Sequence, residues 1–277
     1  MTPPIIQAEL DKACPSAIPR PRKRFIVRCT PTLGSVSIFW AKGVADMLWP
    51  MNYIKGGTDL IDRVGNEIAE CRNELVQKCL SIENDEREVT HIFWLDDDVI
   101  TTPGALMQLM SHDVDVATGV YFVKGAFGEP IIWNPPGAGT IPYRPSPDGE
   151  NTSIRCWMGS MGLSVVRTSV YKRMRDELDI GTDKYGRPQW YRTTAGRASD
   201  ITNDDKVLCV GGTEDAYFAE NLGKLGLDMT VDLTKYAFGF HWDQNIKAAY
   251  PREQWLQASQ GQKVTWKLPD GEVVEWS

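Results

Sequence analysis

Three consecutive aspartates, Asp96, Asp97 and Asp98, directly follow the apolar run at residues 89–95. The run has the length and composition of a buried strand, and ligands of open α/β sheets bind beyond the carboxyl ends of the strands. Adjacent carboxylates repel one another unless a cation lies among them. Hard oxygen ligands suit Mg²⁺ or Mn²⁺, so the sequence predicts a divalent metal site here. The alternative is an exposed acidic turn before a helix, where negative charge is mildly favourable.

Arg72 is the second residue whose place in the sequence calls for a chemical explanation. Apolar residues recur at helical spacing over residues 60–80, and Arg72 lies four residues after Ile68 and three before Leu75, on the apolar side. A guanidinium on such a stripe needs an anionic partner, because burying an unpaired charge is costly. Two interpretations stay open, a structural ion pair with a neighbouring carboxylate or a side chain that faces a ligand.

The elements that must position these side chains alternate between strands and helices. Apolar runs and turn residues predict strands at 25–29, 89–95, 115–121, within 155–167 and at 229–232, and helical spacing predicts helices at 36–49, 60–80, 103–111, 169–178 and from about 213. Thr102 is expected to cap the helix that begins at Pro103. The alternation predicts an α/β fold with a mostly parallel central sheet flanked by helices.

Both ends of the chain differ from this pattern. The first 24 residues are rich in proline and end in Arg-Pro-Arg-Lys-Arg, which is typical of an arm rather than of a packed element. Residues 263–276 hold two alternating apolar and polar runs around Pro-Asp-Gly, and this predicts a C-terminal β-hairpin.

Five segments, taken in order, resemble GT-A fold glycosyltransferases, and most of all the small enzymes of that fold encoded by bacteriophages and bacteria. The segments are ECRNELV at 70–76, LDDDV at 95–99, WMGSMGLSVVR at 157–167, GTEDAYF at 212–218 and FGFH at 238–241. They resemble the Arg-Asn pair, the DxD motif, the acceptor-side strand, the ED motif and the late histidine of that family. The resemblance implies a GT-A, Rossmann-like domain at 25–242, an N-terminal arm at 1–24 and a C-terminal extension with a β-hairpin at 243–277.

The resemblance also implies a metal site. Asp98 would be the best ligand of Mn²⁺ or Mg²⁺, and His241 would complete the site. Asp96 would share the metal or face the donor ribose, and Asp97 would lie on the donor side. For His241 a purely structural role is the alternative.

Further donor contacts are implied around this site. Arg72 would face the acidic metal site or the donor diphosphate, which would supply the anion that its position demands. Pro31 and Thr32 lie where such folds contact the nucleotide base. Lys124 would reach the diphosphate or the donor sugar, and the alternative for Lys124 is an ordinary surface lysine.

The ED motif implies the catalytic carboxylates, Glu214 and Asp215. In an enzyme that inverts the anomeric configuration, which we expect, Asp215 would be the general base toward the acceptor hydroxyl. In a retaining enzyme Asp215 would position the acceptor or the donor. The plainer alternative is that Thr213 caps a helix and the two acids favour its positive end.

The activity expected from the resemblance is transfer of a sugar from a nucleotide-sugar, with a UDP-sugar as the expected donor, to an acceptor hydroxyl. A hydroxymethylated base of phage DNA is the expected acceptor, and a protein or a glycan is the alternative. A nucleotidyltransferase that makes nucleotide-sugars would carry a glycine-rich basic loop, whereas residues 30–37 hold one glycine and no basic residue. A non-catalytic relative that binds sugar or nucleic acid is the third possibility.

Composition bounds these expectations. The chain has 277 residues, 42% hydrophobic and 24% charged, which excludes a disordered, collagen-like or coiled-coil protein. Its net charge of −7 disfavours a general nucleic-acid binder, yet five of the 37 acidic residues belong to the predicted site, and basic residues gather at 20–24 and 184–205. Six scattered cysteines, no signal peptide and no apolar run of about 20 residues predict a soluble cytoplasmic protein (in the host cytoplasm if phage-encoded) without membrane contact.

Overall fold

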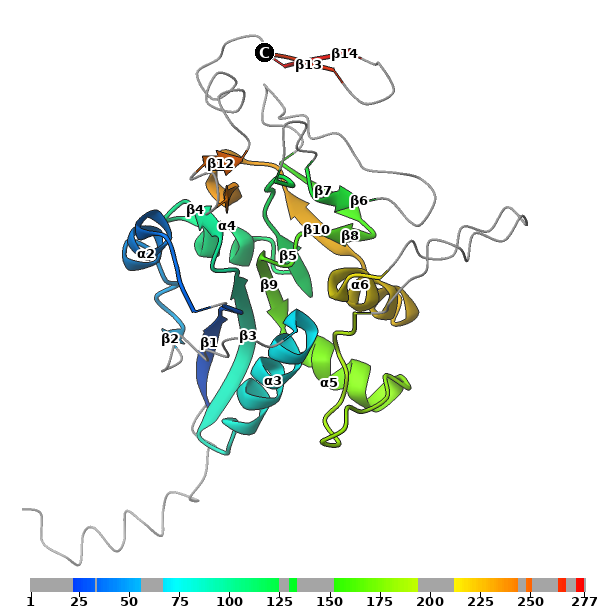
Figure 1. Cartoon of the computed structure of the whole chain (residues 1–277). Helices are drawn as coiled ribbons and strands as arrows, with labels where there is room; N and C mark the ends of the chain where they lie inside the picture. The colour runs from blue at the N-terminus through cyan, green and yellow to red at the C-terminus, as the bar shows by residue number, and fades with distance from the viewer. Residues whose placement is uncertain are drawn as a thin grey trace, which may run out of the picture.

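The computed structural model describes residues 22–32, 34–55, 67–124, 130–133, 152–193, 212–243, 248–250, 264–267 and 273–276. A seven-stranded sheet in the order β2-β1-β3-β9-β5-β10-β7 forms the centre of the fold. Its strands are β1 (Lys23–Cys29), β2 (Ile54–Lys55), β3 (Arg87–Leu95), β5 (Val116–Thr118), β7 (Ser153–Cys156), β9 (Leu163–Arg167) and β10 (Met229–Asp232). Helices pack against this sheet (Figure 1), so the fold belongs to the mixed α/β class.

The strands of the central sheet run in both directions. β1 is parallel to β2 and to β3, and β5 is parallel to β10. β9 is antiparallel to both of its neighbours, β3 and β5, and β7 is antiparallel to β10. Five strands therefore share one direction, as the sequence predicted for most of the sheet, and β9 and β7 run against them.

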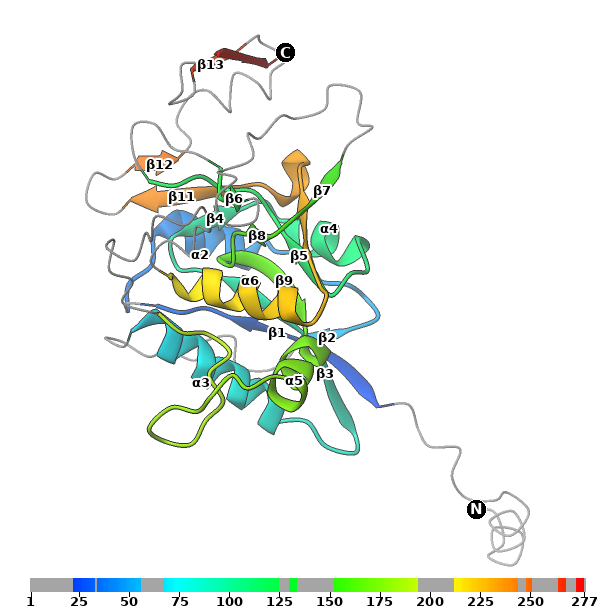
Figure 2. The ribbon, with the colours of Figure 1, turned by 90° about the vertical axis from the view of Figure 1, so that its right-hand side faces the viewer.

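Helices cover both faces of the sheet. Along β3, Ile92 and Trp94 join the buried cluster under α3 (Ile68–Ser81), α5 (Thr168–Glu177) and α6 (Glu214–Lys224). Phe93 and Leu95 join the cluster under α2 (Ile38–Ala45) and α4 (Ala105–Ser111). Figure 2 shows α3, α5 and α6 on one side of the sheet and α2 and α4 on the other. A strand buried on both faces has no polar side, which is why the end of β3 is continuously apolar.

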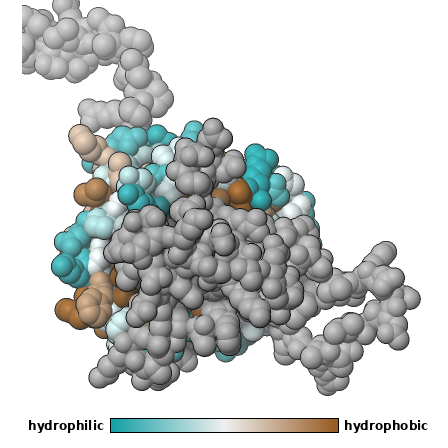
Figure 3. Space-filling view, turned by 90° about the horizontal axis from the view of Figure 1, so that it is seen from above, coloured by the Kyte–Doolittle hydropathy of each residue, from teal (hydrophilic) through white to brown (hydrophobic). Residues whose placement is uncertain are grey.

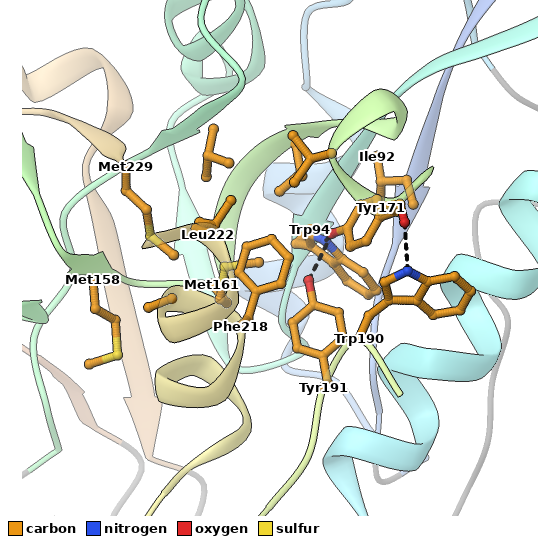
Figure 4. Packing of buried hydrophobic residues seen from close by; sticks show 14 of the residues in the cluster. Ile92, Trp94, Met158, Met161, Tyr171, Trp190, Tyr191, Phe218, Leu222 and Met229 are labelled. Carbon is orange, nitrogen blue, oxygen red and sulfur yellow. Dashed lines mark hydrogen bonds between the residues drawn. The ribbon is translucent and has the colours of Figure 1, made fainter. Parts of the chain in front are cut away.

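Aromatic side chains fill the core between β3, α5 and α6 (Figure 4). Trp94 Nε1 donates to the Tyr171 hydroxyl at 2.8 Å, and that hydroxyl lies 2.7 Å from the hydroxyl of Tyr191. Trp190 Nε1 donates to Tyr171 O at 2.8 Å, and Phe218 stacks on Tyr191 with ring centroids 4.9 Å apart. Because the polar tips are paired, these large side chains can be buried and hold the loop of Tyr191 against β3.

Smaller sheets complete the fold. β4 (Val99–Thr101), β11 (Gly239–Asp243) and β12 (Ala248–Tyr250) form an antiparallel sheet in the order β12-β11-β4, and β6 (Ile132–Trp133) pairs with β8 (Met158–Gly159). His241 pairs with Val99, so β11 approaches the acidic turn that follows β3. β13 (Val264–Lys267) and β14 (Val273–Trp276) pair antiparallel, which confirms the strand pairing of the predicted hairpin, while its Pro-Asp-Gly turn lies outside the described residues.

Several element ends differ from the prediction. α2 is shorter than the predicted helix at 36–49, and β1 begins at Lys23, within the segment predicted as the end of the arm. Residues 60–66 of the predicted helix at 60–80, and residues 1–21 of the arm, lie outside the described residues. The segment predicted as one or two strands within 155–167 contains β8, β9 and part of β7.

The predicted cap at Thr102 is wrong. α4 begins at Ala105 after Gly104, which has no side chain to bond the helix end. The Thr102 hydroxyl donates instead to Tyr236 O, in the short 3₁₀ helix η1 (Lys235–Ala237) that packs on α4. The Thr102 hydroxyl therefore makes a tertiary hydrogen bond and does not cap the helix.

Part of the surface near α2 is apolar. Ile38, Phe39, Leu48 and Met51 are exposed. Seen from above, hydrophobic residues lie at the left edge of the molecule, the side on which α2 lies in Figure 1 (Figure 3). Among the described residues, no helix combines the length and the apolar character needed to cross a bilayer.

Candidate active site

The turn after β3 is fixed by hydrogen bonds from three other parts of the chain. Asp96 N donates to Gly162 O at 2.9 Å, and Trp40 Nε1 of α2 donates to Asp96 O at 2.8 Å. Trp242 N of β11 donates to Asp98 O at 2.6 Å. These bonds satisfy buried backbone groups and hold the turn in one conformation. The three aspartates predicted from the sequence therefore occupy a fixed position at the carboxyl end of β3.

Arg72 lies in the core directly behind this turn. Its Nη2 lies 3.0 Å from Asp96 Oδ2 and 3.1 Å from Oδ1, and its Nε lies 3.5 Å from Glu214 Oε1. The guanidinium lies over the rings of Trp94 and Tyr191, 5.1 and 5.8 Å from their centroids. Burial alone would lower the pKa of Arg72, but the carboxylates raise that pKa well above its usual value, so the group stays charged. The structure confirms the ion pair, one of the two interpretations that the sequence left open. Arg72 pairs with Asp96 of the acidic turn and with Glu214.

Gly162 provides the surface against which the Asp96 carboxylate packs. A Cβ at Gly162 would lie 2.5 Å from Asp96 Oδ2 and 2.6 Å from the Tyr121 hydroxyl, which itself accepts a hydrogen bond from Gly162 N at 3.2 Å. Only glycine permits this approach, which accounts for the residue in the segment 157–167. Burial raises the pKa of Asp96 to about 6; Arg72 acts against that rise, while Asp98 adds to it.

Asn73, the neighbour of Arg72, has a structural role. Its Nδ2 donates to Tyr191 O at 2.7 Å, and Tyr191 N donates to its Oδ1 at 2.9 Å. Both polar backbone groups of Tyr191 are thereby tied to α3, and the tyrosine ring is held next to the guanidinium. The Arg-Asn pair thus contributes one side chain to the site and another to the loop that supports it.

Asp98 contacts two side chains other than Arg72. His241 Nε2 lies 3.1 Å from Asp98 Oδ2, and Lys124 Nζ lies 2.6 Å from the same oxygen. On its other side His241 Nδ1 lies 3.0 Å from Phe122 O. Burial alone would raise the pKa of Asp98, but its bonds to His241 and Lys124 hold that pKa below its usual value. The carboxylate is therefore ionised at neutral pH.

The proton positions on His241 bear on metal binding. A carbonyl oxygen can only accept, so Nδ1 donates to Phe122 O, and the hydrogen bond between Nε2 and Asp98 Oδ2 then has its proton on Nε2, where a metal ion would take the place of that proton. Two acceptors that face each other need a proton or a cation between them. Histidines that bind metals commonly donate their other nitrogen to a backbone carbonyl in this way.

The residues present fit a divalent ion at Asp98 and His241. Their separation of 3.1 Å is close to the distance of about 3 Å between neighbouring ligands of an octahedral ion with bonds of about 2.1 Å. Within the described ranges, no group of three or more His, Cys, Asp or Glu side chains could hold a metal. Mg²⁺ commonly takes one or two protein carboxylates and completes its shell with phosphate and water. Asp96 contacts Arg72 instead, so its predicted share in the metal stays a prediction, as does the donor role of Asp97, which is half-buried in the turn.

A second pair of acids begins α6. The Thr213 hydroxyl accepts from Ala216 N at 3.4 Å, so the cap expected from the sequence is confirmed. The cap does not account for Asp215, whose Oδ1 is buried and has no hydrogen-bond partner in the part of the chain that the structure describes. Burial, and next the neighbouring Glu214, raise the pKa of Asp215 well above its usual value. A buried carboxyl oxygen without a donor is suited to accept a proton.

Tyr121 is electrostatically coupled to both acidic groups, and no role was predicted for it from the sequence. Burial raises the pKa of its phenol well above the usual value, and the carboxylates of Asp96, Asp215 and Asp98 raise it further. The Tyr121 ring packs edge-on against His241 with centroids 5.2 Å apart. Its place at the end of a predicted strand, at the same sheet edge as the acidic turn, is the signal that could have identified it.

Pro31 and Thr32 lie at the same edge of the sheet. They follow β1, whose Cys29 pairs with Trp94 of the parallel strand β3, so the two strands end side by side. Thr32 is largely buried and its hydroxyl accepts from Gly34 N at 2.9 Å. The structure thus places both residues at the same edge of the sheet as the acidic turn, and their contact with a nucleotide base stays a prediction.

Comparison with known proteins adds little. No protein-family model matches the chain, and no curated protein matches it in sequence. Among solved structures, A197 from STIV is similar with a TM-score of 0.46 and 12% sequence identity, over 92% of this chain and 94% of that chain. At that TM-score the likeness identifies neither the fold family nor the activity of the chain.

Proposed function

We propose that the chain is a metal-dependent glycosyltransferase of the GT-A type, which moves a sugar from a nucleotide-sugar, with a UDP-sugar as donor, to an acceptor hydroxyl. The observation that carries the proposal is the pairing of Asp98 with His241 at the carboxyl end of β3. The buried, unpartnered oxygen of Asp215 supports it, since the carboxylates of Asp98 and Asp215 both raise the pKa of the same side chain, Tyr121. One side of the site would hold the metal and phosphates, and the other would accept a proton.

On the donor side, Asp98 and His241 would hold Mn²⁺ or Mg²⁺. When bound, the ion supplies Lewis-acid stabilisation of the charge that develops on the departing diphosphate. Arg72 is committed to Asp96 and Glu214 inside the core and mainly keeps those carboxylates in place. Lys124, whose side chain is 35% exposed, can turn toward a phosphate.

On the acceptor side, Asp215 would act as the general base. The acceptor oxygen forms a bond to the anomeric carbon, the bond from that carbon to the diphosphate oxygen breaks, and the acceptor proton moves to the Asp215 carboxylate. The raised pKa of Asp215 makes the ionised carboxylate a stronger base than an exposed one. One direct displacement inverts the configuration, so the anomeric form of the product tests this role.

For the acceptor, we take a hydroxymethylated base of DNA, with a protein or glycan hydroxyl as the alternative. Of the arginines in the polar segment 184–205, Arg192 is exposed, Arg187 is bound to Asp183 at 2.6 Å, and Arg197 lies outside the described residues. Affinity for duplex DNA that falls steeply with salt would support DNA. Lack of binding at low salt would exclude it.

A donor screen tests the activity. Purified protein is incubated with Mn²⁺ and a panel of nucleotide-sugars, and nucleotide release is followed in the wild type, in Asp98→Asn and in Asp113→Asn. Asp113 pairs with Arg167 at 2.5 Å on the surface, so its variant controls for loss of an aspartate elsewhere. We expect release that is lost in Asp98→Asn and kept in Asp113→Asn. Donor binding that needs no metal and survives Asp98→Asn would reject the proposal.

A further inference from the structure

Lys124 makes a direct ion pair with the carboxylate that faces His241. Its Nζ lies 2.6 Å from Asp98 Oδ2, the oxygen that lies 3.1 Å from His241 Nε2. Lys124 is 35% exposed, so its ammonium can leave the carboxylate without disturbing the core. Partly exposed pairs of this kind contribute little to stability, so stability alone does not account for a lysine at this position.

The same oxygen is the one that a metal ion would use. His241 Nδ1 donates to Phe122 O, so Nε2 is the ring nitrogen that faces Asp98 Oδ2 and could share an ion with it. An ion held by these two atoms would lie next to the ammonium of Lys124. Two cations at such short range repel each other, and the ammonium is the one that can move.

We propose that Lys124 is the counter-ion of Asp98 while no metal is bound, that it competes with a divalent cation for this carboxylate, and that it transfers to the donor phosphate when cation and nucleotide bind together. The inference rests on the proposed function and adds a regulatory step to it. A divalent cation alone is opposed by the ammonium, whereas a diphosphate gives the ammonium a new partner. Cation and nucleotide therefore bind more tightly together than separately, and the coupling is reciprocal.

Binding of Mn²⁺ to the full chain without nucleotide tests the competition. The free ion is followed by its electron paramagnetic resonance signal. Lys124→Met should bind Mn²⁺ about fivefold more tightly than the wild type, the size expected for removal of a partly exposed ion pair. Lys124→Arg keeps the competing charge and should stay within about twofold of the wild type.

Lys172→Met is the matched control. Lys172 Nζ lies 2.7 Å from Glu83 Oε2, and the side chain is 38% exposed, so the pair resembles that of Lys124 in length and exposure but joins α5 to the turn after α3. Its loss should leave the Mn²⁺ affinity unchanged. Added UDP should tighten Mn²⁺ binding in the wild type and in Lys172→Met, and should do so less in Lys124→Met.

The outcomes separate this inference from the proposed function. Tighter Mn²⁺ binding in Lys124→Met that disappears when Asp98→Asn is added supports the competition. Equal affinity in the wild type and Lys124→Met, with binding lost in Asp98→Asn, overturns the competition and leaves the metal site in place. Lack of Mn²⁺ binding in every variant, Lys124→Met included, overturns both.

Discussion

Replacing Arg72 with methionine should destabilise the fold strongly. Arg72 is 1% exposed, and the side chains of its partners, Asp96 and Glu214, are 18% and 13% exposed. Methionine keeps a long apolar side chain beside Trp94 but leaves both carboxylates without their buried cation. Breaking a buried pair from one side costs about 3–5 kcal/mol. Because the partners keep some contact with water, we expect the lower end, about 3 kcal/mol.

Urea unfolding followed by tryptophan fluorescence, in buffer with a chelator, measures this effect. With an m-value of about 3 kcal/mol/M for a chain of this size, the midpoint should fall by about 1 M while m stays constant. Arg187→Met is the control, because Arg187 is 19% exposed and pairs with Asp183 at 2.6 Å and with Glu74 at 3.4 Å. That variant should lose about 1 kcal/mol or less. Equal losses in the two variants would refute the view that Arg72 balances buried charge.

Three further changes have defined outcomes. Gly162→Ala places a Cβ 2.5 Å from Asp96 Oδ2 and should cost about 1–3 kcal/mol. Gly104→Ala meets nothing within 4 Å and should be neutral, so equal shifts in thermal unfolding would contradict the packing argument. Burial lowers the pKa of His91 from 6.5 to about 4. Above pH 6.5 His91 is neutral in both states and the free energy of unfolding is at its full value. As the pH falls from 6.5 through 4, the unfolded state binds the proton more readily, and the free energy of unfolding falls, by about 2 kcal/mol at pH 5. His91→Gln should remove this loss, and a difference between wild type and variant that stays constant from pH 7.5 to 5 would disprove it. Asp215→Asn should reduce kcat about 10²- to 10⁴-fold with unchanged UDP affinity, and an unchanged kcat would show that Asp215 is not the general base.

The half of the site around Arg72 was accessible to prediction because it follows from two periodicities. Side chains alternate along β3, so Asp96 continues the face of Ile92 and Trp94. That face packs in one buried cluster with α3, whose core-facing stripe carries Arg72. A helix that buries a guanidinium and a strand that ends in a carboxylate on the same face bring opposite charges together.

The half around Asp98 depends on contacts that no periodicity encodes. Lys124 reaches the carboxylate from the chain that follows β5, and nothing in its neighbours in the sequence distinguishes it from a surface lysine. The position of β9 in the sheet could not be predicted either, because an apolar run predicts a strand but not its direction or its neighbours. Yet β9 lies antiparallel between β3 and β5, and the residue before it, Gly162, contacts the acidic turn.

Asp96 pairs with Arg72 and Asp98 pairs with Lys124, and these two cationic side chains differ in how easily a metal ion can displace them. This difference decides which carboxylate a metal ion can reach. Displacing Arg72 from Asp96 would mean opening the core, whereas Lys124 can swing from Asp98 into water. The isosteric variants should therefore separate two properties. Asp98→Asn should abolish Mn²⁺ binding with little change in the urea midpoint, because it removes a ligand and a partly exposed pair. Asp96→Asn should leave Mn²⁺ affinity within about twofold and change the midpoint, because it alters the buried pair with Arg72. The reverse pattern would place the metal on Asp96 and make Arg72, rather than Lys124, the cation that yields.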